Sequence, residues 1–328
     1  MAGEATDKLV TVFGGSGFLG RHVVRALVKR NYRVIVAVRR PDLAGHLQPL
    51  GRVGQIHALQ ANVRYPASVE AATRGADAVV NLTGILFERG RQRFDAVQSA
   101  GAETVARAAE AQGARMVHIS AIGADAESPS AYARSKAIGE QAVLASAPGA
   151  TVLRPSIMFG AEDHFFNRFA AIARMSPVLP LIGGGDTLFQ PVFAGDVAAA
   201  VGKAVAGETT PGTIYELGGP EVRSFKDLMQ YMLATIQRRR LLVPVPFGLA
   251  KLQAMLLQYF PNPLLTPDQV QLLRRDNVVS AQARQEGRSF EALGITPDAM
   301  ETIVPTYLWR FRKTGQFKPP QPVVRPNS

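Results

Sequence analysis

Residues 9–21 read LVTVFGGSGFLGR, and this stretch decides the fold. Its turn follows the apolar segment Leu9–Phe13 and contains Gly14, Gly15, Ser16, Gly17, Phe18, Leu19 and Gly20. In a Gly-x-x-Gly-x-x-Gly motif between a strand and a helix, the first glycine allows a tight turn and the second lets a diphosphate approach the backbone. The third lets the helix pack closely on the strand. The N-terminus of the following helix offers unpaired N–H groups to phosphate oxygens. The run therefore predicts the phosphate-binding turn of a dinucleotide site.

Strand and helix patterns alternate through the first 150 residues. Continuous apolar strands separated by helices indicate a parallel sheet that is buried on both faces. We therefore predict an α/β fold, a doubly wound parallel Rossmann sheet with a smaller mixed C-terminal lobe. The predicted strands are Leu9–Phe13, Arg33–Val38, Gln55–Gln60, Ala78–Leu82, Met116–Ser120 and Thr151–Leu153, and the predicted helices are Arg21–Arg30 and residues 66–74, 94–112 and 131–147.

After Arg154 and Pro155 the pattern becomes irregular, because stretches rich in Gly and Pro separate the helices. We expect a dinucleotide-binding domain over residues 1–155, with room for later segments to add strands to it, and a smaller interaction lobe over residues 156–317. Residues 318–328 (KPPQPVVRPNS) predict an extended, proline-rich tail. The helices predicted in the lobe are residues 195–206, 225–239, 248–259 and 298–313.

The composition excludes several kinds of site. The sequence has no cysteine, which rules out disulfides, iron–sulfur clusters and cysteine zinc sites. Its 5 histidines show no metal-ligand spacing, so we expect no metal. The strand near the start leaves no room for a secretion signal, and no stretch is long and apolar enough to span a bilayer. We expect a protein of the cytoplasm, or of the cytoplasmic face of a larger assembly.

The net charge of +11 is unevenly distributed, because residues 223–328 carry 15 Lys and Arg against 7 Asp and Glu. This excess suits an anionic surface such as phospholipid headgroups or an acidic protein, and it is equally consistent with an ordinary solvated basic face. The basic clusters lack interleaved aromatic residues, so we expect no nucleic-acid partner.

The residues after the second strand indicate which dinucleotide is bound. NAD sites place a carboxylate there to bind the ribose 2′-hydroxyl, whereas this chain has Arg39 and Arg40 and no acidic residue before Asp42. Two guanidinium groups suit a 2′-phosphate, which favours NADP(H) over NAD(H). After the third strand Asn62 and Val63 are expected to flank the adenine, and after the fourth Leu82, Thr83 and Gly84 are expected to line the dinucleotide.

Tyr132 and Lys136 lie one helical turn apart in the segment YARSK, so both project from the same helix face. A lysine ammonium lowers the pKa of a neighbouring phenol and can bind the nicotinamide ribose. We assign both residues to the cofactor site. We also count Ser120, Pro155 and Ile157 among the cofactor-binding residues.

Together these motifs resemble the extended short-chain dehydrogenase/reductase family over about residues 8–220. The resemblance rests on the glycine turn, on Tyr132 with Lys136, on LRPS at residues 153–156 with Gly160, and on QPVFAGDV at residues 190–197. Active members of the family place a catalytic serine where this chain has Ile122. An aliphatic side chain cannot donate a hydrogen bond to a developing oxyanion, so we assign no catalytic residue.

Within that family the chain is similar to the Rossmann-fold accessory subunits of respiratory complex I. The similarity is carried by FGGSGFLGRHVV, VVNLTG, PSIMFGAEDHFFNRFA, LLVPVPFGLAKLQ and TYLWRFR. The resemblance implies a non-catalytic accessory subunit of the proton-pumping NADH:quinone oxidoreductase, with a structural NADPH. It also implies other complex I subunits near the quinone site as partners, and a peripheral place on the cytoplasmic face of a bacterial inner membrane, where it stabilises the junction of the two arms.

Two other functions remain open from the residues. One is an NADPH-dependent reductase or epimerase, and the other is a redox-sensing module with degraded catalysis. The helix near residues 248–259 also has two interpretations, because its apolar residues recur at helical spacing. They form either a face turned to the core or an apolar surface on a membrane or hydrophobic subunit, with Arg238, Arg239 and Arg240 near anionic headgroups.

Overall fold

The computed structural model describes residues 8–260 and 263–315, which form two compact units. The first unit contains the chain up to Ser156 together with Ala194–Gly218 and Val279–Pro297. The second contains Ile157–Phe193, Gly219–Val278 and the chain from Asp298. The polypeptide therefore leaves the first unit and returns to it twice. The tail predicted for residues 318–328 lies outside the described residues.

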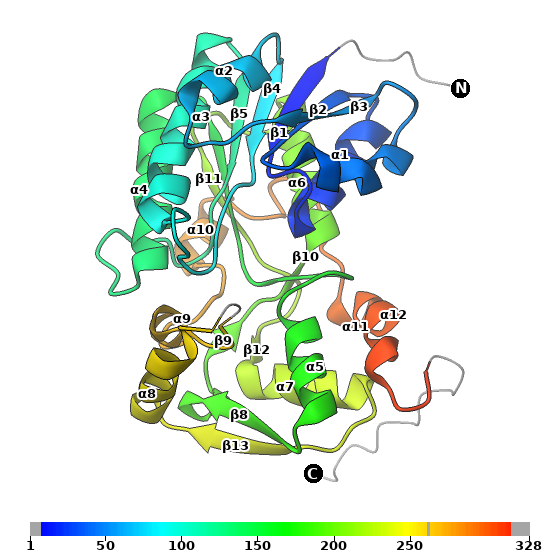
Figure 1. The fold of residues 1–328 in the computed structure, drawn as a ribbon, viewed down its shortest axis with the longest axis vertical. Helices are drawn as coiled ribbons and strands as arrows, with labels where there is room; N and C mark the ends of the chain where they lie inside the picture. Colours follow the sequence, from blue (N-terminus) through cyan, green and yellow to red (C-terminus); the bar gives the residue numbers. More distant parts are fainter. Residues whose placement is uncertain (1–7, 261–262, 316–328) are drawn as a thin grey trace. The chain divides into compact units, whose positions relative to one another are not determined.

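A seven-stranded parallel sheet forms the centre of the first unit (Figure 1). Its strands are β1 (Leu9–Phe13), β2 (Arg33–Val38), β3 (Ile56–Gln60), β4 (Ala78–Asn81), β5 (Arg115–Ile119), β6 (Thr151–Pro155) and β11 (Ile214–Leu217). Their order is β11-β6-β5-β4-β1-β2-β3, so the sheet is wound in two directions from β1 and β4. Val12 is paired with Val36 on one side and with Val80 on the other. The predicted doubly wound Rossmann sheet is confirmed.

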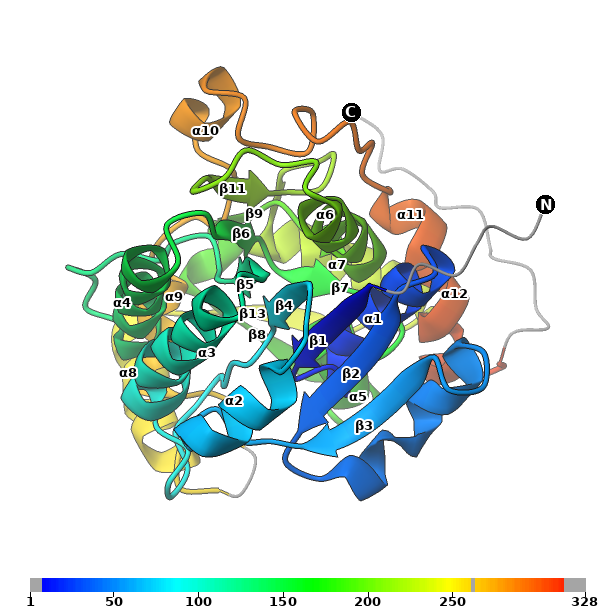
Figure 2. The ribbon, with the colours of Figure 1, turned by 90° about the horizontal axis from the view of Figure 1, so that it is seen from above.

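Helices cover both faces of this sheet in two groups (Figure 2). On one face α1 (Phe18–Lys29) packs on α6 (Ala194–Ala206), where Arg30 donates a hydrogen bond to the carbonyl of Gly202 at 3.0 Å. On the other face α3 (Ala100–Ala111) lies between α2 (Pro66–Thr73) and α4 (Ala131–Ser146). The core on this side is built mainly of alanine and valine, and such small side chains let helices lie close to the strands.

The last segment of the first unit is tied to the outer strand. It contains the short helix α10 (Ala281–Gln285). The backbone N–H of Glu216 donates to the carbonyl of Arg288 at 2.9 Å, and Ser280 donates its own N–H to the Glu216 carboxylate at 2.8 Å. Residues far from the N-terminal sheet in sequence therefore complete its edge.

The second unit combines short strand pairs with helices around an aromatic core. Six phenylalanines of this core form a chain of ring contacts: Phe159, Phe165, Phe166, Phe169, Phe189 and Phe225. Tyr307 donates to the buried carboxylate of Asp163 at 2.5 Å. Its elements are β7 (Met158–Phe159), α5 (Phe166–Met175), β8 (Val178–Ile182), β9 (Leu188–Phe189), β10 (Val192–Phe193), β12 (Arg223–Ser224), α7 (Phe225–Thr235), β13 (Leu241–Val245), α8 (Phe247–Leu257), α9 (Pro267–Leu272), α11 (Met300–Ile303) and α12 (Pro305–Leu308).

Some predicted helices have different bounds. The helix expected over residues 94–112 is divided, because a π-helical turn, η2 (Asp95–Ser99), precedes α3. The helix expected over residues 298–313 consists of α11, α12 and the 3-10 turn η4 (Trp309–Phe311). Proline lacks the N–H group that a continuous helix needs, so Pro305 starts a new helix. Among residues 8–260 and 263–315, we find no helix with the length and apolar character to cross a membrane.

Candidate functional site

The carboxyl ends of β1 and β4 meet at the point where the strand order reverses. Ligands of doubly wound sheets bind in this position. Gly14 follows β1, and a Cβ atom built on it would lie 3.4 Å from the carbonyl carbon of Leu82, which follows β4. The N–H of Leu82 donates to the carbonyl of Phe13 at 3.0 Å. The structure thus brings the glycine turn and the segment after β4 side by side.

The glycine turn has the backbone geometry that its sequence requires. Gly14 has a φ of +78°, a conformation that L side chains rarely adopt. A Cβ atom on Gly20 would lie 2.4 Å from the carbonyl carbon of Gly15, so α1 can pack this close only with glycine there. Gly17 is the N-cap of α1 and provides no side-chain cap, and the first turn of α1 has no acidic residue. The N–H groups of this turn therefore suit an anion.

Two predicted residues of the turn have side chains that are already engaged. Leu19 is buried in the core, so only its backbone suits a ligand contact. The ring of Phe18 packs edge-on against His22, with centroids 5.9 Å apart. Ser16 and Gly15 complete the turn between β1 and α1.

The two arginines after β2 differ in their surroundings. Arg40 forms a two-point ion pair with Asp42, with Nε–Oδ1 at 2.9 Å and Nη2–Oδ2 at 2.6 Å. Both side chains of this pair are exposed, and the Arg40 hydrogen bond lowers the pKa of Asp42. Arg39 is exposed in the position directly after the strand. The pairing with Asp42 neutralises one of the two predicted phosphate ligands and makes Arg39 the stronger candidate.

The residues after β3 lie in a turn stabilised by their own hydrogen bonds. Asn62 Oδ1 accepts the backbone N–H of Arg64 at 3.2 Å, and the N–H of Asn62 donates to Ser68 Oγ at 3.1 Å. Val63 is buried and belongs to the core beside α3. The Val63 side chain therefore has a packing role, and a contact with adenine would fall to the backbone and to Asn62.

The segment after β4 approaches the helix that carries Tyr132 and Lys136. Thr83 donates both its N–H (3.1 Å) and its hydroxyl (2.5 Å) to Asn81 Oδ1, which fixes the turn. A Cβ atom on Gly84 would lie 3.5 Å from Nζ of Lys136 and 3.6 Å from Oε1 of Gln98. The structure therefore brings Gly84 and Lys136 together from two separate segments of the sequence.

Lys136 is buried, and its pKa lies below the ordinary value for a lysine. Its Nζ donates to the carbonyl of Ile119 at 3.1 Å, at the end of β5. Burial lowers the pKa of Lys136 to about 8, and the carboxylate of Glu140 acts in the opposite direction. Burial also lowers the pKa of the neighbouring His118 to about 3, with a contribution from Lys136, so His118 is neutral at pH 7.

Ser120, directly after β5, is buried, and its Oγ has no hydrogen-bond partner among the described residues. A buried hydroxyl without a partner is costly, so this atom suits a bound polar group. Together with the uncapped start of α1, the cradle at Gly14 and the buried Lys136, it forms a polar site that suits a dinucleotide. The residues present therefore fit the predicted cofactor.

The position expected for a catalytic serine is occupied by an isoleucine, which makes apolar contacts. Ile122 is buried and packs with Val279 and Ala283 of the same unit. Its backbone N–H donates to the carbonyl of Pro155 at 3.1 Å. Tyr132 lies edge-on to Phe94, with ring centroids 5.9 Å apart. The phenol and the lysine of the family motif are thus present, without a hydroxyl at residue 122.

Two further predicted residues lie on either side of the boundary between the units. Pro155 ends β6 in the first unit and is paired with Leu217 of β11. Ile157 belongs to the second unit, where its N–H donates to Asn277 Oδ1 at 2.9 Å and its carbonyl accepts the N–H of Val192 at 2.9 Å.

The sequence did not point to two residues that organise this site. Gln98 accepts the N–H of Ile85 at 3.0 Å and donates to Ser135 Oγ at 2.8 Å, which connects the segment after β4 to α4. Glu140 binds Arg154 of β6 through both carboxylate oxygens, at 2.8 and 2.5 Å. Glu140 lies one turn beyond Lys136, a spacing that could have suggested its role, whereas nothing in the sequence distinguishes Gln98.

Among residues 8–260 and 263–315, we find no group of three His, Cys, Asp or Glu side chains placed to hold a metal ion.

Comparisons with known proteins identify the family of the chain. Residues 10–218 match the model of the NAD dependent epimerase/dehydratase family. The chain is 35% identical over 320 residues to the mitochondrial NADH dehydrogenase [ubiquinone] 1 alpha subcomplex subunit 9 of Arabidopsis thaliana, which covers 94% of this chain and 79% of the relative. It is also 35% identical over 180 residues to the ceramide reductase of Caulobacter vibrioides, which covers 54% of this chain and 56% of that protein.

Solved structures share the fold at low identity. The NADPH-dependent quinone oxidoreductase of Escherichia coli, solved with NADPH, superimposes with a TM-score of 0.71 at 19% identity, covering 91% of this chain and 99% of the other. The dTDP-glucose 4,6-dehydratase of Bacillus anthracis, solved with NAD, gives a TM-score of 0.69 at 15% identity, covering 93% and 96%.

The glycine turn, the Tyr132–Lys136 pair and the matched sequence lead to the same assignment, and the resemblance seen in the sequence is confirmed. The chain belongs to the NAD dependent epimerase/dehydratase family and, within it, to the group that includes the NADH dehydrogenase alpha subcomplex subunit 9 proteins.

Proposed function

We propose that this protein is an accessory, non-catalytic subunit of the proton-pumping NADH:quinone oxidoreductase, respiratory complex I. It holds NADPH as a structural ligand and stabilises the junction of the peripheral and membrane arms near the quinone site. Its partners are other subunits of that complex. The similarity to the subunit 9 protein extends over 94% of the chain, well beyond the nucleotide-binding residues.

One observation supports the non-catalytic role. The dinucleotide-binding features are present, yet the position expected for a hydroxyl that donates a hydrogen bond to the oxyanion holds the buried side chain of Ile122, packed on Val279 and Ala283. Loss of such a donor typically costs about a hundredfold or more in rate. The chain also has no cysteine to bind an iron–sulfur cluster.

A structural ligand contributes through binding energy. A ligand that binds only the native state, present at a hundred times its dissociation constant, adds about 2.7 kcal/mol to the free energy of unfolding.

The residues of the first unit have distinct parts in holding the nucleotide. When bound, NADPH would bring a dihydronicotinamide, which is a hydride donor, and several negatively charged phosphate groups. The N–H groups of the glycine turn and of α1 bind its diphosphate, Arg39 binds the 2′-phosphate, and Lys136 binds the nicotinamide ribose through its ammonium group. Asn62 and the segment Leu82–Gly84 line the site, with Ser120, Tyr132 and Pro155 as further contacts.

We also propose a peripheral place on the cytoplasmic face of a bacterial inner membrane. The excess of basic residues beyond residue 223 supports contact between the C-terminal lobe and anionic phospholipids.

Co-purification tests the assignment to complex I. The complex isolated in mild detergent from the source organism, through a tag on another subunit, should contain this chain. Mass spectrometry of the nucleotide released on denaturation should find NADP(H). Absence of the chain from the intact complex would refute the proposal.

A second candidate function is an NADPH-dependent reductase. It is supported by the retained Tyr132 and Lys136 and by the similarity to the Caulobacter ceramide reductase. Protein mixed with NADPH and a panel of carbonyl compounds separates the two functions through absorbance at the nicotinamide band. Turnover that Tyr132→Phe abolishes would favour the reductase, whereas unchanged absorbance supports the structural role.

Arg39→Ala is expected to weaken NADPH binding by about 10- to 100-fold, because a hydrogen bond to a charged group contributes about 1.5–3 kcal/mol. NADH binding should change little, because NADH lacks the 2′-phosphate. Arg40→Ala is the matched control and should have the smaller effect, since Asp42 already neutralises Arg40. Titration calorimetry on nucleotide-free protein measures the affinities of wild type and both variants for NADPH and for NADH. A larger loss in Arg40→Ala than in Arg39→Ala would contradict this assignment.

NADPH affinity is expected to fall as the pH rises above 8, because Lys136, with a pKa of about 8, then loses its charge. The sign follows from the ligand: phosphate charges favour the ammonium form, so binding takes up a proton above pH 8 and is weaker there. Calorimetry between pH 6.5 and 9.5 measures this dependence. Lys136→Met should bind more weakly and lose the dependence in this range, and a variant that retains it would exclude Lys136 as its source.

A further inference from the structure

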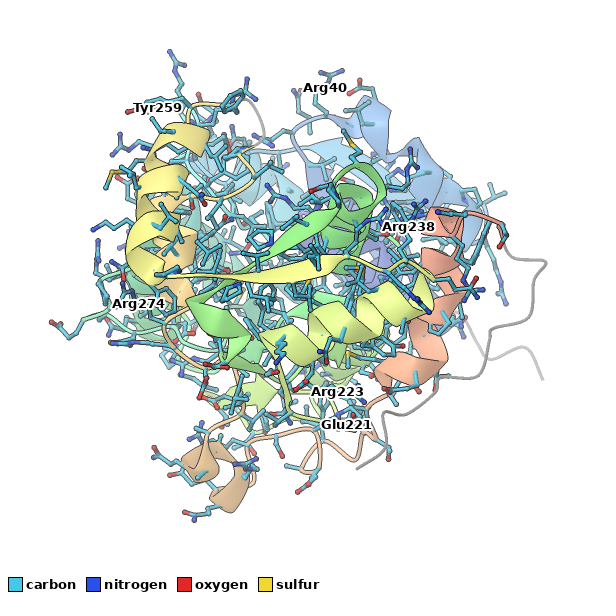
Figure 3. The ribbon with its side chains drawn as sticks, turned by 90° about the horizontal axis from the view of Figure 1, so that it is seen from below. Arg40, Glu221, Arg223, Arg238, Tyr259 and Arg274 are labelled. Carbon is cyan, nitrogen blue, oxygen red and sulfur yellow. The ribbon has the colours of Figure 1, made fainter. Side chains whose placement is uncertain are left out.

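The helix α8 buries only small residues and exposes large apolar ones. Ala250 and Ala254 are its buried positions. Leu252 is 59% exposed, Leu256 68% and Tyr259, just beyond the helix end, 84%. Figure 3 shows Tyr259 at this end of α8. Of the two interpretations of this helix, the structure supports the exposed apolar surface, because alanines occupy the inward face.

The exposed residues form one continuous face. A helix turns 100° per residue, so residues two and six positions after Ala250 lie on the side opposite to it, and Leu249 and Met255 flank them. Leu249 is 49% exposed and Met255 42%. Phe260, 63% exposed, extends this face past the helix end. We call this set the α8 surface: Leu249, Leu252, Met255, Leu256, Tyr259 and Phe260.

The sequence segment that contains the α8 surface carries positive charges and no acidic residues. Between Asp227 and Asp268 the sequence contains no Asp or Glu, whereas it contains four Lys and Arg, at residues 238–240 and 251. Lys251 is exposed on α8 itself, and the guanidinium of Arg274 lies 4.5 Å from the ring centre of Phe247, at the start of the helix. An apolar face with cations at its margin and aromatic residues at its end is typical of a helix that lies in a lipid interface.

The three consecutive arginines have another role. Arg238 donates to the carbonyl of Phe311 at 2.9 Å and Arg240 to that of Ala173 at 2.7 Å, so both help to hold the second unit together. The strand β13 separates them from α8 in the sequence, and Figure 3 shows Arg238 away from Tyr259 and Arg274. Two cations therefore lie on α8 or beside its start: Lys251 on the helix itself and Arg274 over the ring of Phe247.

We propose that the α8 surface docks on an anionic phospholipid membrane, with its leucines and aromatic rings among the acyl chains and Lys251 and Arg274 at the headgroups. The inference rests on the proposed function, which places the protein on a bacterial inner membrane. It assigns the membrane contact to one helix, α8. The positive margin favours lipid over a hydrophobic subunit, because anionic headgroups would pair with these cations at any point along the interface.

Flotation of the full-length, NADPH-loaded protein with vesicles tests the proposal. Wild-type protein should bind vesicles of phosphatidylcholine with phosphatidylglycerol, and bind pure phosphatidylcholine less well. Leu252→Glu/Leu256→Glu should bind the mixed vesicles at least tenfold more weakly, because it removes apolar contact and adds negative charge. Lys251→Gln/Arg274→Gln should lose the preference for phosphatidylglycerol.

Leu43→Glu/Val53→Glu is the matched control in the first unit, since these side chains are 63% and 106% exposed and the charge change is the same. It should bind vesicles like the wild type. All variants should keep their thermal midpoint and bound nucleotide, because every site is exposed. Equal vesicle binding by wild type and Leu252→Glu/Leu256→Glu overturns the α8 assignment.

Co-purification separates this inference from the proposed function. If wild-type protein binds no vesicles, and Leu252→Glu/Leu256→Glu is lost from complex I, the α8 surface contacts a protein subunit and the lipid proposal is wrong while the complex I role stands. If wild-type protein binds vesicles through α8 but is absent from complex I, the surface assignment stands and the proposed function is wrong.

Discussion

Gly20→Ala protein is expected to purify without nucleotide, whereas the wild type retains it. The added Cβ would lie 2.4 Å from both the carbonyl carbon and the oxygen of Gly15 and 2.5 Å from the oxygen of Gly14. These are backbone atoms of the glycine turn, so the turn must move away from the start of α1. We expect a loss of NADPH affinity of about a hundredfold, and overpacking that costs about 1–3 kcal/mol. Chromatography of the denatured protein measures the nucleotide.

Gly45→Ala provides the matched control for this substitution. A Cβ atom there meets no other atom within 4 Å, so the variant should retain nucleotide and its thermal midpoint. If Gly20→Ala protein held nucleotide at the wild-type stoichiometry, the glycine turn would not be the diphosphate site.

Glu140→Ala is expected to lower the free energy of unfolding by about 2–3 kcal/mol and to weaken NADPH binding. The variant removes the two-point partner of the Arg154 guanidinium, which is 21% exposed, and leaves the Glu216 carboxylate at 3.6 Å. Breaking a buried ion pair on one side costs about 3–5 kcal/mol, and the remaining partner and partial exposure reduce that cost. Glu140 also raises the pKa of Lys136, so its loss leaves less ammonium to bind the nucleotide. Urea unfolding and calorimetry measure the two effects.

Glu103→Ala removes a carboxylate from a surface pair with Arg107 and serves as its control. Such exposed pairs contribute about 0.3–0.5 kcal/mol, so unfolding should change little. Equal destabilisation by the two substitutions would show that the buried pair has no special weight.

The sheet was predictable because its strands are buried on both faces. Segments such as RVIVAV at residues 33–38 are apolar throughout, which only a covered parallel strand tolerates. The breaks were harder to predict. Pro305 is the one signal in the sequence for the break inside the helix predicted over residues 298–313, because proline starts a new helix there. The strand β11 has only four residues, and nothing in them indicates that it pairs with β6. That pairing depends on tertiary structure.

The site was partly predictable, for different physical reasons at each residue. Gly14 and Gly20 could be identified because their backbone geometry excludes other residues. The pairing of Arg40 with Asp42 could have been expected from their spacing, and it changes the weight of the two arginines. Gln98 could not be found, because an amide side chain in an alanine-rich segment carries no pattern and acts through its place in the fold.

The route of the chain has a consequence for its synthesis. On the ribosome, β6 emerges with one edge unpaired, and its neighbour β11 is made only after some sixty further residues, most of which belong to the other unit. Strand edges left open in this way are prone to join other chains. The nascent first unit therefore cannot close its sheet until translation has passed Leu217, and its last segment, Val279–Pro297, is added later still. A fragment that stops at residue 155 would keep this nascent state and its tendency to aggregate.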